Sequence, residues 1–106
     1  MLSPVQRKII IEKMDIIKVI SGYLKLINSE LQPRGPINYI GCCPFHHEKT
    51  PSFVVMPLKK EYKCFGCSSK GDVIDFIMQI KNINIEKALD EIALEYDVWW
   101  SEYNTV

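Results

Sequence analysis

The fold is decided by the stretch Cys43-Pro44-Phe45-His46, which is followed after 17 residues by Cys64-Phe65-Gly66-Cys67. In each stretch two residues separate two metal-ligating side chains, so that one tight turn can point both at a single ion. Gly66 suits such a turn because glycine adopts a positive φ without steric cost. Two such turns on neighbouring hairpins supply three thiolates and one imidazole. The spacing therefore predicts one structural Zn²⁺ ion with the ligands Cys43, His46, Cys64 and Cys67.

Other uses of these residues remain open. Cys42 and His47 adjoin the proposed ligands, so either could substitute at slightly altered spacing. The cysteines could also form two disulfides or be unrelated buried thiols. The sequence shows no signal-peptide core and no apolar run that could cross a membrane, so we expect a cytoplasmic, reducing location, where metal binding is more common than disulfides. Four protein ligands leave no position for a reacting water, which indicates a structural ion.

Length and charge narrow the function further. The 106 residues fit one domain, without room for separate cofactor and substrate domains. The 13 basic and 13 acidic residues cancel, which excludes a uniformly cationic nucleic-acid binder. The charge is nevertheless unevenly placed, since residues 25–70 carry seven basic and three acidic side chains and residues 71–106 carry two and eight. This asymmetry suggests one surface for anions and one that faces water or protein.

The hydrophobic pattern predicts an α+β fold, a small antiparallel β-sheet zinc ribbon flanked by N-terminal and C-terminal α-helices. Asp72 and Asn84 are placed to cap the two clearest helices. We expect a domain over 1–98, with a tail or the start of a linker at 99–106. We expect helices within 5–22, a zinc ribbon over 23–70 and helices within 72–97. The ribbon should begin with a strand-like segment at 23–27 and a loop at 28–36. Its strands are expected at 37–42, 52–56 and 61–64.

The metal motif is part of a longer pattern. The stretches 43–53, 62–67 and 71–76 closely resemble the N-terminal zinc-binding domain of bacterial DnaG-type DNA primases, and the likeness runs from about Asp15 to Val98. The resemblance implies a zinc ribbon that engages single-stranded DNA template and helps to select the start site of RNA primer synthesis in DNA replication. It also implies two partners, a primase polymerase domain in cis or in trans and a replicative helicase that is met through other parts. We find no catalytic constellation within these residues, so the nucleotidyltransferase activity would belong to a parent primase.

Basic and aromatic residues interleave around the second metal-binding stretch. Lysines can follow the phosphates of a single strand while rings stack on its bases. The candidate DNA-binding residues are Arg34, Lys49, Lys59, Lys60, Tyr62 and Lys63. The alternative is that Phe53 and Phe65 belong to the core and that the lysines only keep a small sheet soluble.

A second hypothesis is a non-catalytic interaction module, for example a mobile-element or phage accessory. Such a module would dock on a polymerase or helicase partner through its acidic helices and the Trp99-Trp100 pair. The sequence alone leaves both hypotheses open.

Overall fold

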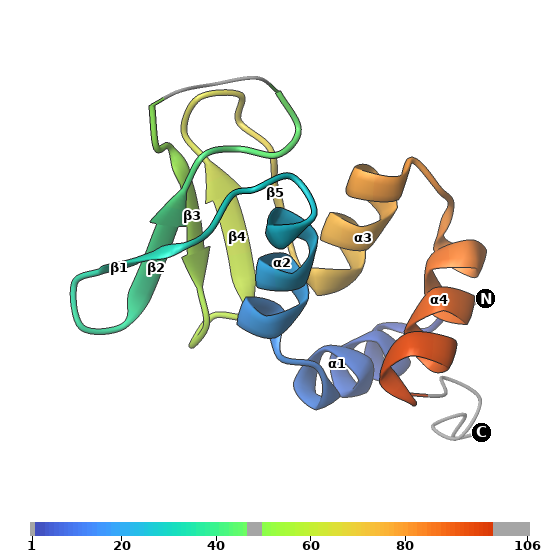
Figure 1. Ribbon diagram of the computed structural model, residues 1–106. Coiled ribbons are helices and arrows are strands. Elements are labelled where there is room, and N and C mark those ends of the chain that lie inside the picture. The colour runs from blue at the N-terminus through green and yellow to red at the C-terminus, as the bar shows by residue number, and fades with distance from the viewer. Residues whose placement is uncertain (1, 47–49, 99–106) are drawn as a thin grey trace.

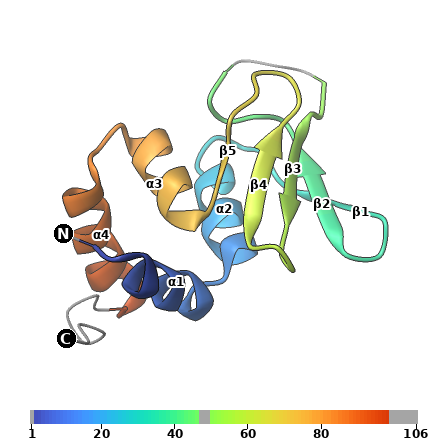
Figure 2. The same ribbon diagram turned by 180° about the vertical axis from the view of Figure 1, so that it is seen from behind.

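The computed structural model of the protein describes residues 2–46 and 50–98. Within these ranges the chain forms four helices and a five-stranded antiparallel sheet, which confirms the predicted fold class. The sheet occupies one end of the molecule and the helices gather at the other, with α2 between them (Figure 1). No helix of the described residues covers the sheet face that Figure 2 turns toward the viewer.

Two capped helices open the chain. Helix α1 spans Pro4–Lys13 and begins with a capping box between Ser3 and Gln6. Helix α2 spans Ile16–Lys25, and the Asp15 carboxylate accepts hydrogen bonds from the first free backbone N–H groups.

The strand-like assignment of 23–27 is wrong. Helix α2 continues to Lys25 because Ile20 and Leu24, one turn apart, are both fully buried on the same face. A turn then closes the helix, with a hydrogen bond from the Ser29 N–H to the Leu24 carbonyl and with Asn28 at φ 55°. Tertiary packing has here outweighed the strand preference of the side chains.

The sheet has the order β1-β2-β3-β4-β5, with every neighbouring pair antiparallel. The predicted loop at 28–36 contains edge strand β1, in which Pro33 is tolerated because an edge strand need not donate on both sides. The short strand β5, which follows the second metal-binding turn, was not predicted. The strands are β1 (Gln32–Arg34), β2 (Asn38–Gly41), β3 (Phe53–Met56), β4 (Glu61–Cys64) and β5 (Lys70–Gly71).

Strand β4 alternates between a buried and an open face, whereas Phe53, Val54 and Val55 of β3 are all buried. In β4, Tyr62 and Cys64 are buried, whereas Glu61 and Lys63 are exposed. The Tyr62 ring stacks on the Phe53 ring at a centroid distance of 5.3 Å. Phe76 of the following helix meets the Tyr62 ring edge-on at 5.7 Å, which joins the inner sheet face to the helices in one core.

Helix α3 (Val73–Lys81) begins directly after β5, and helix α4 (Ile85–Tyr96) follows a short turn. Their predicted caps, Asp72 and Asn84, are both present. The Asp72 carboxylate also accepts two hydrogen bonds from Arg7, which binds Asp75 as well, so α1 is clamped to the first turn of α3. Asp72 and Asp75 thus serve as cap and clamp.

Among the described residues, none of the helices combines the length and the apolar character needed to span a bilayer.

The junction between β5 and α3 depends on a glycine. A Cβ atom at Gly71 would lie 2.5 Å from the Cβ and Oδ2 atoms of Asp75, whereas a Cβ at Gly22, within α2, would meet nothing within 4 Å. Gly71→Ala should therefore destabilise the zinc-loaded protein by about 1–3 kcal/mol through overpacking. Gly22→Ala should stabilise it by about 0.5–1 kcal/mol through helix propensity. Urea unfolding of both variants measures the difference, and equal effects would contradict the close contact.

Candidate metal centre

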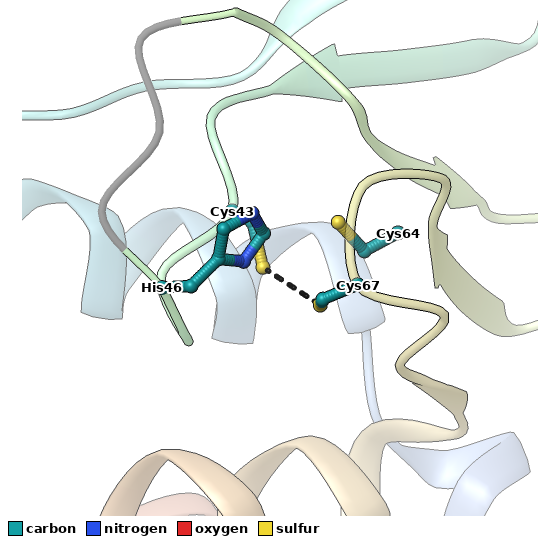
Figure 3. A group of neighbouring side chains, drawn as sticks. All are labelled: Cys43, His46, Cys64 and Cys67. Atoms are coloured by element: carbon teal, nitrogen blue, oxygen red, sulfur yellow. Dashed lines mark hydrogen bonds between the residues drawn. The ribbon is translucent and has the colours of Figure 1, made fainter.

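The four predicted ligands come from two turns that face each other across the metal-binding end of the sheet. Cys43 and His46 lie in the turn after β2, Cys64 ends β4, and Cys67 lies in the turn before β5. Figure 3 shows the His46 ring beside Cys43, opposite the turn that carries Cys64 and Cys67. The ligating atoms of all four side chains lie within 4.8 Å of one another.

The geometry fits a tetrahedral zinc ion. The Sγ atoms of Cys43 and Cys67 are 3.8 Å apart (Figure 3). Zn–S bonds of about 2.3 Å at tetrahedral angles place two sulfurs about 3.8 Å apart, whereas a disulfide requires about 2.05 Å. All four cysteines are free thiols, and the Nδ1 atom of His46 is shielded from solvent. Three thiols and one imidazole are the donor set of a closed, structural Zn²⁺ site.

The second turn has a different backbone from the one expected. The residue with a positive φ is Ser68, at 64°, and Gly66 is not among the residues of positive φ. The turn is closed by the Ser68 N–H, which donates to the Cys64 carbonyl at 2.9 Å, and by the Cys64 N–H, which donates to the Ser69 carbonyl at 2.7 Å. These bonds fix the direction of both cysteines of the turn.

Two residues adjoin the ligands in sequence and were considered as substitute ligands, Cys42 and His47. Cys42 is half-buried and lies outside the group formed by the four ligands. His47 lies outside the described residues, so its role as a substitute ligand stays untested.

Two buried thiols respond in opposite ways to their surroundings. Burial raises the pKa of Cys43 to about 12. Burial also opposes ionisation of Cys64, but hydrogen bonds from the Ser52 side chain and from the backbone of Cys67 and Gly66 outweigh it and lower the pKa of Cys64 to about 7. A divalent cation is therefore needed to hold both groups as thiolates at neutral pH.

The candidate DNA-binding residues are dispersed. Lys59 and Lys60 lie in the β3–β4 turn, at the end of the hairpin away from the metal ligands, and Lys60 pairs with Glu12 at 3.8 Å. Arg34 is exposed on the edge strand β1. Lys49 lies outside the described residues.

The assignment of Tyr62 needs correction. Its side chain is 1% exposed and packs among core rings, so it cannot stack on a nucleic-acid base. The exposed ring is instead Phe65, which is 64% exposed beside the metal ligands. The Lys63 ammonium lies 5.1 Å from the centre of the Phe65 ring, a cation–π contact.

One basic residue was missed in the sequence. Lys70 lies directly opposite Lys63 across the β4–β5 pair, so the two lysines share the open face of the sheet. The lysine itself is visible in the sequence, but a strand of only two residues leaves no periodicity from which its orientation could be predicted.

Removal of the metal should unfold the ribbon. We expect a strong chelator, or the substitution Cys64→Ser, to abolish the near-UV circular dichroism of the Phe53–Tyr62 core, because metal binding contributes folding free energy of about 10–16 kcal/mol in small zinc domains. Cys42→Ser is the matched control and should retain the native spectrum. A native spectrum after complete zinc removal would contradict this expectation.

Zinc affinity should rise with pH. At neutral pH the cysteines of the metal-free chain carry their protons, because an exposed thiol has a pKa of about 8.5 and burial in a folded ribbon raises the pKa of Cys43 to about 12, so zinc binding releases protons. The logarithm of the apparent association constant should therefore increase by at least about one per pH unit above neutrality. Competition titrations against a chromophoric chelator at several pH values test this, and a pH-independent constant would exclude thiols as ligands.

Comparison with known proteins agrees with the site. A family model described as a CHC2 zinc finger, of the DnaG zinc-ribbon type, matches residues 4–105. The chain is 43% identical over 89 residues to the DNA primase of Borreliella burgdorferi and 42% identical over 94 residues to that of Thermotoga maritima. These matches cover 80% and 89% of this chain, but the chain spans only 16% of the length of either relative.

A solved structure shares the fold. The crystal structure of the Aquifex aeolicus primase, which comprises its zinc-binding and RNA polymerase domains, aligns with a TM-score of 0.75 and 39% sequence identity. The alignment covers 87% of this chain and 21% of the Aquifex chain. With the family match over almost its whole length and with its Cys43, His46, Cys64 and Cys67 cluster, the chain belongs to the CHC2 zinc finger family of DnaG-type primases.

Proposed function

We propose that this chain is the zinc-binding domain of a DNA primase and that it presents single-stranded template at the start site of primer synthesis. In this proposal Cys43, His46, Cys64 and Cys67 hold one structural Zn²⁺ ion. Single-stranded DNA then lies on the open face of the sheet. The domain over 1–98 acts as a template reader.

The observation that carries the proposal is the Lys63–Phe65 pair. The two residues flank the ligand Cys64 in sequence, and the ring of Phe65 lies exposed beneath the ammonium group of Lys63. An exposed ring beside a cation is what a single strand requires, since the ring can stack on a base while the cation meets the adjoining phosphate. The metal orders the turn that carries Phe65. DNA binding at this pair therefore depends on zinc, although the ion itself contacts no DNA and catalyses no reaction.

The remainder of the open face extends this surface. Strand register aligns Ile40, Val54, Lys63 and Lys70 in one row across four strands. The apolar middle of the row is half-buried to buried, and its end at β5 is basic. By the same alternation Arg34 lies on this face at the opposite edge, which gives phosphates a second contact.

Primer synthesis itself requires residues beyond this domain. A metal with four protein ligands has no open position for a nucleotide. We therefore propose that the domain works beside an RNA polymerase domain, in cis or in trans, as the two domain names of the Aquifex structure suggest. Contact with a replicative helicase through other parts remains an expectation from the family resemblance.

The salt dependence of DNA binding tests the surface. Each phosphate contact contributes a slope of about −0.7 to a plot of log affinity against log salt for single strands. The double substitution Lys63→Ala with Lys70→Ala should therefore reduce the slope by about 1.4. Fluorescence anisotropy with short single-stranded and duplex DNA, both with zinc-loaded protein, measures this slope, and the duplex should bind more weakly.

Two further variants separate the contributions. Phe65→Ala should weaken binding by about 1–3 kcal/mol at every salt concentration and leave the slope unchanged, because a stacked ring releases no counterion. Lys8→Ala with Lys18→Ala removes the same charge from helices α1 and α2 and should change neither quantity. If both lysine pairs reduced the salt slope equally, DNA binding would depend only on the net charge of the protein, and this result would contradict the assigned surface.

One observation favours the alternative, an interaction module. Leu94 is 78% exposed on α4, between the acidic residues Asp90 and Glu95. The acidic residues around it suit a basic protein partner. If Leu94→Ser protein still binds DNA in a zinc-dependent way, the template-reading proposal stands. If the unmodified protein binds no DNA and Leu94→Ser abolishes binding to a protein partner, the alternative is favoured.

A further inference from the structure

A chain of three hydrogen bonds leads from the core to the metal ligand Cys67. The hydroxyl group of Tyr62 donates to Oε1 of Gln79 at 3.2 Å. The Nε2 atom of Gln79 donates to the hydroxyl oxygen of Ser69 at 3.1 Å. That oxygen lies 3.2 Å from Sγ of Cys67. The chain joins strand β4, helix α3 and the second metal-binding turn.

The orientation of the Gln79 amide sets the direction of these bonds. Its Oε1 atom faces Tyr62 and accepts from the phenol, and its Nε2 atom faces Ser69 and donates. The Ser69 oxygen then accepts from that nitrogen, and its own proton remains available for the sulfur. When Cys67 is a thiolate it has no proton to give, so the Ser69 hydroxyl donates to it.

Cys67 is the ligand that most needs such support. Cys43 and Cys64 are buried, and Cys64 has Ser52 at 3.5 Å, whereas Cys67 is exposed. Hydrogen bonds from surrounding groups orient ligands and tune a metal site, and their loss typically costs about 10- to 100-fold in metal affinity.

We propose that Ser69 and Gln79 are positioning residues for the metal centre, in which Gln79 directs the Ser69 hydroxyl proton at the sulfur of Cys67 and so stabilises this exposed zinc thiolate. The inference rests on the zinc site proposed above and adds to it a link from helix α3. The four ligands bind the ion. The position of Gln79 on α3 determines how strongly the most exposed ligand, the Cys67 thiolate, is stabilised.

Zinc affinity of the full chain, measured by competition with a chromophoric chelator, provides the first test. Ser69→Ala should weaken zinc binding by about 10- to 100-fold. Ser69→Thr keeps the hydroxyl and should restore most of the affinity. Ser21→Ala removes a hydroxyl from helix α2, outside both metal-binding turns, and should stay within about twofold of the unmodified protein.

A double-mutant cycle tests the role of Gln79. Gln79→Met keeps the length of the side chain but removes the donor, so it should weaken zinc binding by less than Ser69→Ala does. The double variant should bind zinc as weakly as Ser69→Ala alone, because both substitutions act through the same bond to Cys67. Additive losses would mean that Gln79 acts by another route and would overturn the chain of bonds.

Alkylation supplies a readout that a purely structural role would not change. In zinc-loaded Ser69→Ala protein, iodoacetamide should modify Cys67 faster than in the unmodified protein, while the rates at Cys43 and Cys64 remain the same, as followed by peptide mass spectrometry. Equal acceleration at all three cysteines would show general loosening and overturn the inference. If the unmodified chain binds no zinc, the proposed site fails, whereas tight zinc binding that Ser69→Ala leaves unchanged contradicts only the present inference.

Discussion

The convergence of three thiols and one imidazole at a single point is the constraint on which the rest of the structure depends. The strands are short, with four residues in β3 and β4 and two in β5. A domain of 106 residues buries a limited fraction of its surface, so its stability from packing alone is small. Without a cation, the centre would be a group of thiols, one of them with a pKa near 12, enclosed between two turns. A zinc ion converts this unfavourable cluster into the strongest cross-link of the fold.

The metal also fixes the strand register on which the open face depends. Cys64 ends β4 and must point inward to reach the ion, so Tyr62 points inward as well and Lys63 points outward. A slip by one residue would place the ligand on the solvent side and a lysine in the core. The ligand geometry, the aromatic core and the Lys63–Lys70 pair are therefore consequences of one register. This dependence explains how a structural ion can control the surface proposed for the template, which the ion does not touch.

Much of this was predictable because the strongest signals are local. The ligand spacing, the caps at Asp72 and Asn84 and the strand at 61–64 all follow from short patterns, and the structure contains each of them. The end of α2 was mispredicted because β-branched and aromatic residues favour strands, while burial of Leu24 against the core decides for helix. Strand β1 was hidden by its proline, and β5 is too short to show a period.

The misassignment of Tyr62 is different, since the sequence contained the necessary signal. Residues two apart in a strand face the same side, so an inward Cys64 requires an inward Tyr62. The hydrogen-bond chain through Gln79 and Ser69 could not have been foreseen, because it depends on where α3 packs against the second turn. Tertiary placement of this kind carries no local pattern.

The most direct test of the central claim is the X-ray absorption spectrum of the zinc-loaded protein at the zinc edge. The account predicts one zinc per chain with three sulfur neighbours at about 2.3 Å and one imidazole nitrogen at about 2.0–2.1 Å. Four sulfur neighbours would mean that Cys42 replaces His46, and oxygen neighbours would mean that the site is open to solvent. Either result would contradict a closed centre built from Cys43, His46, Cys64 and Cys67.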